Sequence, residues 1–419
     1  MTIKSTFLWT SVHTAIKIVS GIIMNKIIAV YLGPSGLALI GQFQNFSQIV
    51  INIASGSFHT GITKYTAEHH ASEAKRQTLW NNAFLISFAL SLITFLAVLL
   101  FNDFFTKKIF FNAHYHTVLI VFAFSIPFYV LNLLYISIIN GFQNIRLYTK
   151  INILMSLATL VLTVSLTWLY RMEGALYSLI ISQVLIFIIT FYYLQKEYPF
   201  RFFRFKELLQ DKDTQIMKQL LAYGSVSFAS GVFMSLMLLA VRYIIVDNFS
   251  LDYAGYWEAL WKISTYFLMI SMLPMSIYYI PKFSATHDTS AIKMLLLEAY
   301  KVFIPLQILA GVLIYVFREE FILLLFSKDF LFISSILIFM LLGDVLRISG
   351  YILGNLFYAK ALMKRFLLLD LLYNSLLTGL VYVFIQHYGF TGVGYAYLVA
   401  NLFVLAYFAY FYSKLHSAK

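Results

Sequence analysis

Apolar blocks of about 20 residues follow one another along this chain, and each is long enough to cross the hydrocarbon core of a bilayer as an α-helix. The 419 residues are 61% hydrophobic and only 11% charged, whereas soluble domains are roughly half apolar and a quarter charged. A membrane β-barrel would show short segments of alternating polarity instead. The pattern therefore predicts an all-α integral membrane protein.

Twelve of these blocks are predicted to span the membrane. They cover residues 8–32, 38–62, 80–101, 117–139, 151–170, 174–195, 220–246, 256–280, 300–318, 331–358, 366–386 and 391–412. The segments between them are short. Even the longest, residues 196–219, leaves no room for a soluble catalytic domain.

Lysine and arginine residues are distributed unequally between alternate loops. The side that holds both termini carries 20 of them and the opposite side carries 5. Because cytoplasmic loops are enriched in basic residues, both termini are predicted to be cytoplasmic. The net charge of +12 then faces anionic lipid headgroups. Nucleic acid is not an expected partner, because no basic domain or groove is evident.

The sequence offers no signal for a metal or a cofactor. It contains no cysteine, which excludes disulfides and thiolate metal sites. The phosphate-binding pattern GxxxxGK[ST] is absent, so ATP hydrolysis is not expected. His69 and His70 adjoin in a polar loop and are expected to be solvated rather than to bind a metal.

Two pairs of segments indicate an internal duplication. "YRMEGALYSLIISQ" at 170–183 resembles "YGFTGVGYAYLVAN" at 388–401, an offset of 218, and "LGPSGLALI" matches "LDYAGYWEA" at 219. The aligned pairs are Tyr170 with Tyr388, Gly174 with Gly392, Tyr177 with Tyr395, Gln183 with Asn401 and Gly36 with Gly255. Residues 1–210 and 211–419 are thus predicted to form two six-helix lobes. They would be related by a pseudo-two-fold axis along the membrane normal, as in transporters with a substrate site between repeats.

Five basic residues fall inside the predicted spans. They are Lys17, Lys26, Arg242, Lys262 and Arg347. A charge at the bilayer centre costs about 2.5–3.5 kcal/mol on insertion scales, so these side chains are expected to face a water-filled cavity. Snorkelling to the interface is the alternative for Lys26, Arg242 and Lys262. Cations outnumber anions inside the spans, which favours an anionic, phosphate-bearing substrate.

Polar residues accompany Lys17 at helical spacing. His13 lies on the same face of the first span, and Asn25 lies slightly further round. Lys26 lies on the opposite face of a straight helix, so it either snorkels to the interface or the helix bends near Ser20. His13 is one candidate for carrying a proton.

The tenth span carries a tighter polar stripe. Asp344, Arg347, Tyr351 and Asn355 lie within about 60° of one another on a helix. Asp344 and Arg347 are three residues apart and can pair, either as a structural ion pair or as part of the function. Asp344 is the second candidate for carrying a proton.

Three segments carry a family resemblance. "LGPSGLAL" from Leu32, "GITKY" from Gly61 and "LGDVLRISGYILGN" from Leu342 resemble the Wzx-type flippases, and especially the branch with the lipid III flippase of the enterobacterial common antigen. Their superfamily also contains the MATE multidrug exporters and the lipid II flippase. The resemblance implies two six-helix lobes in a V shape and alternating access driven by an ion gradient. Lys17, Lys26 and the Asp344–Arg347 pair match charged positions of the family.

The resemblance further implies an undecaprenyl-diphosphate-linked oligosaccharide as substrate, moved between leaflets of the bacterial inner membrane. Rich use of Phe, Ile, Asn, Lys and Tyr favours an O-antigen unit, with lipid III as the alternative. The O-antigen polymerase and its chain-length regulator are possible partners, and a monomer is expected. A cation-coupled small-molecule exporter is a more distant alternative that the excess of Lys and Arg disfavours.

Two other classes of membrane protein fit the sequence less well. An O-antigen polymerase would be an enzyme with larger periplasmic loops than this chain offers. A major facilitator would carry an acidic and basic motif between its second and third spans, where residues 64–77 read "KYTAEHHASEAKRQ". The sequence therefore predicts a transporter rather than an enzyme.

Overall fold

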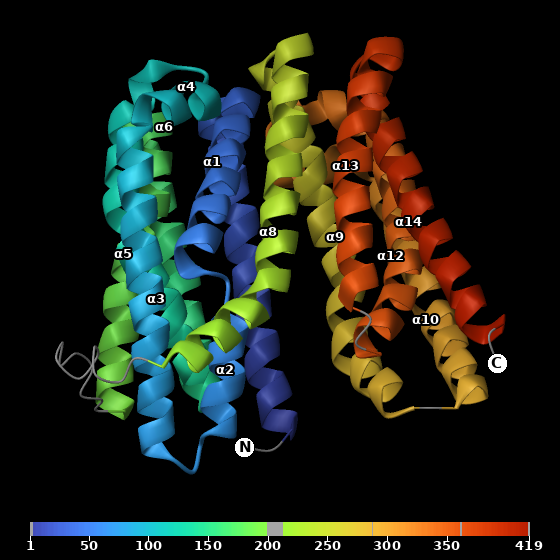
Figure 1. Ribbon diagram of the computed structural model, residues 1–419. Coiled ribbons are helices and arrows are strands. Elements are labelled where there is room, and N and C mark those ends of the chain that lie inside the picture. The colour runs from blue at the N-terminus through green and yellow to red at the C-terminus, as the bar shows by residue number, and fades with distance from the viewer. Residues whose placement is uncertain (1–2, 199–212, 287, 361–362, 418–419) are drawn as a thin grey trace. The chain divides into compact units, whose positions relative to one another are not determined.

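The computed structural model describes residues 3–198, 213–286, 288–360 and 363–417, shown in Figure 1. Within these ranges the chain is helical and contains no β-strand. Eight of its helical stretches are long and apolar enough to cross a membrane, or nine if a bent pair in α9 counts as one span. The predicted all-α, multi-pass membrane architecture is thereby confirmed.

Several neighbouring spans are joined by a break in the backbone rather than by a loop. Helix α1 (Ile3–Ser55) breaks at Gly33, with φ of 66°, and α6 (Ile145–Glu197) breaks at Tyr170–Arg171. A third stretch, Leu367–Lys414, contains Gly389 with φ of 59°. A residue at positive φ cannot continue a right-handed helix. Each break therefore separates two helices where the sequence predicted a short loop.

The chain folds into two compact units. Unit 1 comprises Met1–Leu32 and Leu39–Ser235, and unit 2 comprises Gly33–Ala38 and Leu236–Lys419. The short segment of unit 2 is held by Ser35, whose backbone N–H donates to Asp252 Oδ1 at 3.1 Å. The domain boundary predicted between residues 210 and 211 lies outside the described residues.

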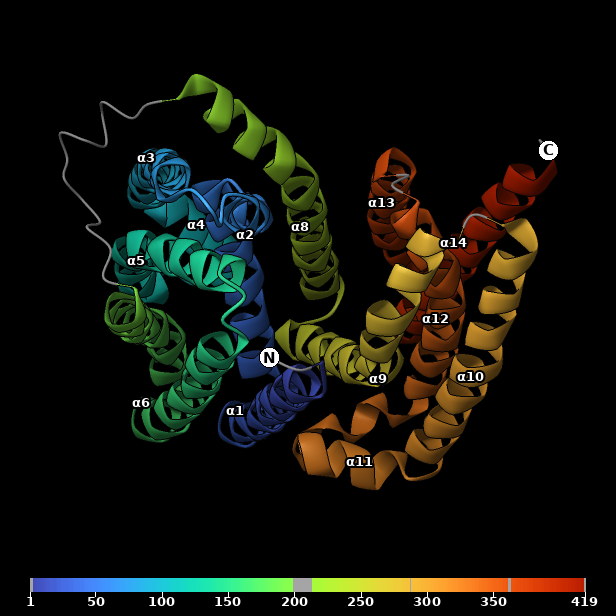
Figure 2. The same cartoon turned by 90° about the horizontal axis from the view of Figure 1, so that it is seen from below.

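Unit 1 is built around α5 (His116–Gly141), which packs between α3 (Glu73–Leu100) and α6 (Figure 2). Its core includes Trp80, which is 1% exposed and donates from Nε1 to Thr66 Oγ1 at 2.9 Å. The remaining elements are α2 (His59–Glu68), α4 (Asn102–Phe110), η1 (Ala113–Tyr115) and the first part of α8 (Thr214–Asn248).

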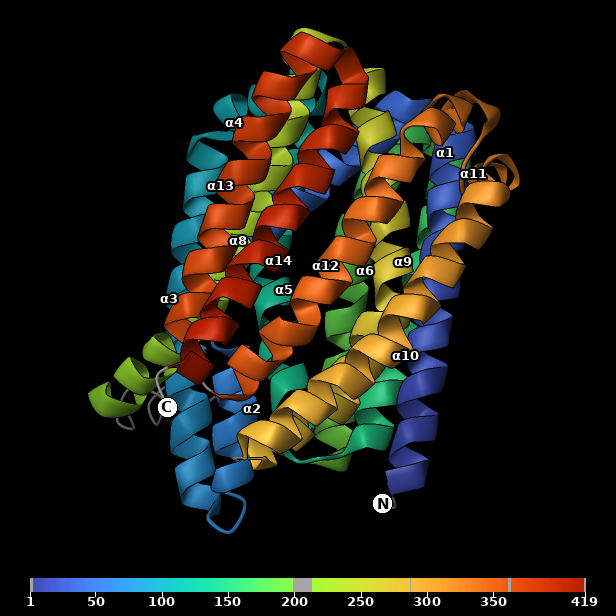
Figure 3. The same ribbon diagram turned by 90° about the vertical axis from the view of Figure 1, so that its right-hand side faces the viewer.

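Unit 2 is built around α12 (Leu337–Ala359). Figure 3 shows this helix between α10 (Thr289–Val316) and α14 (Gly392–Ser417), and it also packs against α9 (Leu251–Ala285). The other elements are α11 (Arg318–Leu325), η2 (Lys328–Ser335), α13 (Met363–Tyr388) and η3 (Gly389–Thr391).

The order of elements in the second half repeats that in the first. Shifted by 218 positions, the end of α5 at Gly141 falls on Ala359, where α12 ends. The same shift brings Arg171, with φ of 51°, onto Gly389, with φ of 59°. The duplication predicted from short sequence matches is therefore visible in the helix boundaries and backbone breaks.

Candidate functional site

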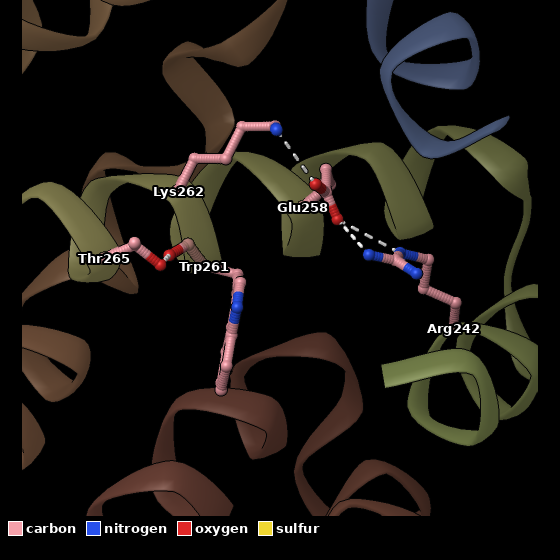
Figure 4. A network of polar contacts seen from close by, with 5 residues as sticks. All are labelled: Arg242, Glu258, Trp261, Lys262 and Thr265. Carbon is pink, nitrogen blue, oxygen red and sulfur yellow. Dashed lines mark hydrogen bonds and ion pairs between the residues drawn. The ribbon is translucent and has the colours of Figure 1, made fainter. Parts of the chain in front are cut away.

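Helix α9 carries an acidic residue that binds two cations (Figure 4). Arg242, from α8, donates from Nε to Glu258 Oε2 at 3.1 Å and also binds this oxygen through Nη2. Lys262 Nζ lies 3.2 Å from Glu258 Oε1. The side chains of Arg242 and Glu258 are only 2% and 5% exposed. Mutual pairing offsets the cost of burying these charges.

The ion pairs of this triad determine whether Arg242 and Lys262, both predicted to face a cavity, are accessible to a ligand. Arg242 is buried against Glu258 and does not snorkel to an interface. The side chain of Lys262 is 18% exposed, so it remains reachable from outside unit 2. The triad keeps one net positive charge, and Lys262 is the member that can present it.

A second cluster surrounds Asp344 of α12, whose side chain is fully buried. Its Oδ1 accepts hydrogen bonds from Ser264 Oγ at 2.6 Å and Tyr397 OH at 2.5 Å. Arg347 donates from Nη1 to the same Tyr397 hydroxyl at 3.3 Å. Tyr397 thus bridges Asp344 and Arg347, two residues that their spacing in the sequence allowed to pair. Among the described residues, no group hydrogen-bonds to Asp344 Oδ2.

Trp261 connects the two clusters through α9. The Arg347 guanidinium lies 5.8 Å from the Trp261 ring centroid and 5.5 Å from that of Tyr373, which stabilises the cation by cation–π attraction. In Figure 4 the Trp261 side chain points away from the one of Lys262. One turn of α9 therefore contributes Glu258 and Lys262 to the ion triad from one face and Trp261 to the surroundings of Arg347 from another.

Arg347 also lines a cavity of about 260 Å³ inside unit 2. The polar residues of its wall are Arg347, Tyr351, Asp370, Tyr373 and Asn401. Two predicted site residues, Arg347 and Tyr351, thus meet at one cavity. Asn355, one turn beyond Tyr351, is 3% exposed, and its Nδ2 has no hydrogen-bond partner among the described residues.

The predicted site residues of the first span lie in unit 1. Lys17 is exposed and makes no ion pair or hydrogen bond with any residue that the structure describes, and half-buried His13 lies one turn before it. Asn25 is 8% exposed. Asn25 and the half-buried Lys26 each interact with another group of the chain. Lys17 is therefore a cation of a predicted span that has no counter-ion among the described residues.

Sequence reasoning missed most of the groups that hold Asp344 and Arg347. Tyr397 and Asn401 both lie in the repeated segment at 388–401, which was a usable signal. Ser264 and Tyr373 carried no signal of their own. Their roles depend on how α9, α12, α13 and α14 pack, which helical periodicity does not reveal.

A sequence profile of the family described as polysaccharide biosynthesis protein matches residues 3–287. The chain belongs to this family. A relative named lipid III flippase, from Escherichia coli (strain K12), is 24% identical over 408 residues and covers 96% of both chains.

Solved structures show which fold this family member shares. An inward-facing MATE multidrug resistance transporter of the MOP superfamily is 18% identical, covers 98% of both chains and has a TM-score of 0.79. The lipid II flippase MurJ, in an inward closed conformation, is 16% identical with a TM-score of 0.77 and covers 97% of this chain and 87% of its own. The comparisons point to a transporter rather than an enzyme, in agreement with the sequence.

Proposed function

We propose that this protein is a flippase that moves a lipid-linked oligosaccharide between the leaflets of the bacterial inner membrane. The observation that carries this proposal is the match to the lipid III flippase, which spans 96% of both chains. A likeness over the whole length, rather than over one motif, favours the same kind of cargo.

The cargo is proposed to be an undecaprenyl-diphosphate-linked oligosaccharide. The relative's name favours a lipid III unit over the O-antigen unit that amino-acid composition favours. The O-antigen unit stays a prediction from sequence with less support.

The diphosphate of this cargo needs cationic partners. Lys17 in unit 1 is exposed and lacks a local counter-ion, and Arg347 in unit 2 lines a cavity. Hydrogen bonds between a cation and a phosphate oxygen are about twice as strong as neutral ones. We propose Lys17 of unit 1, and separately Arg347 and Lys262 of unit 2, as candidate contacts for the diphosphate.

Asp344 is proposed to hold the coupling ion. Its Oδ2 is buried without a hydrogen-bond partner among the described residues, and a proton or a small cation would satisfy this oxygen. The Asp344→Asn variant should therefore keep binding the lipid but lose any response of transport to a proton or sodium gradient. A variant that responds like the wild type would remove Asp344 from the coupling.

The chain is proposed to cross the membrane twelve times. Three of the eight apolar stretches contain a backbone break, at Gly33, Arg171 and Gly389. Counting each of these as two spans and the bent pair in α9 as one gives twelve. An even number places both termini on one side, and the basic loops favour the cytoplasm.

Complementation tests the choice of cargo. The protein would be expressed in an E. coli strain that lacks its own lipid III flippase, and lipid III in the inner leaflet would be measured. The proposal expects accumulated lipid III to fall toward the wild-type level. Persistent accumulation, with relief in a strain blocked in O-antigen flipping, would instead assign the O-antigen unit.

A further inference from the structure

Unit 1 contains two adjoining cavities, of about 260 and 330 Å³. Both are lined by Tyr129 of α5 and Gln183 of α6. Together they reach the range of about 300–1,000 Å³ that is usual for small-ligand sites. We call them the amide chamber, after Gln44, Asn132, Asn152 and Gln183 in their walls.

The wall of the amide chamber combines apolar side chains with polar ones. Among the described residues that line it there is one histidine, His59, but no Asp, Glu, Lys or Arg. Three residues that line it each have a buried polar atom without a hydrogen-bond partner among the described residues: Ser47 Oγ, Asn132 Oδ1 and Gln183 Oε1. A buried polar atom without a partner costs about 1–3 kcal/mol. Two of the three are amide oxygens, which can only accept a hydrogen bond. The chamber is therefore suited to a ligand that donates hydrogen bonds and carries no charge.

The charged cavity of unit 2 is the counterpart of this chamber at the repeat offset of 218. Tyr129, Asn152 and Gln183 in unit 1 correspond to Arg347, Asp370 and Asn401 in unit 2, and all six line their cavities. Gln183 Oε1 and Asn401 Oδ1 are both buried without a partner among the described residues. The two halves thus keep one cavity at equivalent positions but give it different chemistry.

We propose that the amide chamber binds the carbohydrate part of the cargo, whereas cations bind its diphosphate. This inference rests on the proposed flippase function. Sugar hydroxyls would donate to Asn132 Oδ1 and Gln183 Oε1, and the Tyr129 ring offers an apolar face to a sugar ring. A wall without Asp, Glu, Lys or Arg suits uncharged hexoses, because a diphosphate would lose its hydration there without gaining a lysine or arginine as counter-charge.

The test is a binding measurement on the full-length protein in nanodiscs. One probe is undecaprenyl diphosphate bearing a trisaccharide of neutral N-acetylated hexoses, and the other is undecaprenyl diphosphate without sugar. The double variant Asn132→Leu, Gln183→Met removes both amide oxygens with little change in volume. Thr167→Val is the matched control, since Thr167 Oγ1 is also buried without a partner among the described residues but lines neither cavity.

The wild type should bind the trisaccharide lipid about 5- to 30-fold tighter than the sugar-free lipid, since one to two hydrogen bonds of about 1 kcal/mol each are gained. The double variant should lose this difference and bind the sugar-free lipid as the wild type does. Thr167→Val should change neither affinity. Folding should survive, because replacing a buried unpaired polar atom by an apolar group is nearly neutral. If the double variant does unfold, Gln183→Met alone gives the same comparison.

Two results would overturn the inference. One is a wild type that binds both lipids equally, and the other is a double variant that retains the sugar-dependent difference. Neither bears on the flippase proposal, which transport measurements decide separately. A protein that binds the trisaccharide lipid through the chamber but never moves it would contradict the flippase proposal alone.

Discussion

At the scale of single residues, the intramembrane cations divide by how their charge is matched. Arg242 and Lys262 share Glu258, and Arg347 rests on Tyr397 and two aromatic rings. Lys17 is exposed and has no such partner among the described residues. We propose that the ligand supplies the charge opposite to that of Lys17.

Lys17→Ala should abolish transport of the lipid-linked oligosaccharide without unfolding the protein. The substitution removes the charge that we assign to the diphosphate, whereas Lys17→Arg retains charge and should keep part of the activity. Lys64→Ala is the control, because Lys64 forms an exposed ion pair with Glu68 at 3.7 Å, and such pairs contribute about 0–1 kcal/mol. Transport in reconstituted vesicles is the readout. Full activity of Lys17→Ala would contradict the assignment.

The Arg242–Glu258 pair should behave as a structural element. Arg242→Met leaves Glu258 buried with only Lys262 nearby, and breaking a buried pair costs about 3–5 kcal/mol. The double variant Arg242→Met, Glu258→Met should regain most of this loss, because no buried charge is stranded. Thermal unfolding in detergent measures both. A single variant as stable as the wild type would show that the pair is not a structural requirement.

At the scale of elements, one glycine in each half permits a sharp turn between consecutive helices. A Cβ on Gly174 would lie 1.9 Å from Leu166 O, and one on Gly392 would lie 2.3 Å from Phe384 O. The offset of 218 relates Gly174 to Gly392, and it also relates Leu166 to Phe384. The sequence comparison had already matched the two glycines. The sequence predicted that the two glycines are equivalent, but it did not predict the close approach of a backbone carbonyl that requires glycine at each position.

Gly174→Ala and Gly392→Ala should each destabilise the protein by about 1–3 kcal/mol or more, as expected for overpacking against a rigid backbone. Gly379→Ala is the control, since no atom lies within 4 Å of its Cβ position in α13. Alanine is the better helix former by about 1 kcal/mol, so this variant should be neutral or slightly more stable. Equal melting temperatures for all three variants would contradict the structural role of the two turn glycines.

At the scale of the whole molecule, the length of the apolar blocks sufficed to predict a multi-pass helical membrane protein, and short sequence matches at a nearly constant offset predicted its duplication. They did not predict that spans such as 8–32 and 38–62 would join through a break at one residue, because loop length is invisible in a continuous apolar pattern. They also missed the Tyr397 bridge and the amide chamber. Both bring together residues from different helices that are distant in the sequence, as in the Ser264–Asp344 bond.

The proposed topology can be tested with single cysteines, because the chain contains none. Lys107→Cys and Lys328→Cys lie on exposed sites of the loops predicted to be periplasmic, so a membrane-impermeant maleimide should label them in spheroplasts. Lys293→Cys is exposed on the predicted cytoplasmic side and should be labelled only after permeabilisation. The reverse pattern would contradict the predicted orientation.

The most direct test of the central claim is transport by the purified protein in proteoliposomes that hold undecaprenyl-diphosphate-linked oligosaccharide. An impermeant glycosidase would report how much glycan reaches the other leaflet, with and without an ion gradient. The account predicts movement well above that in empty liposomes and in Lys17→Ala vesicles. Movement no faster than in empty liposomes under every gradient, with folded protein and the glycan that complementation selects, would contradict it.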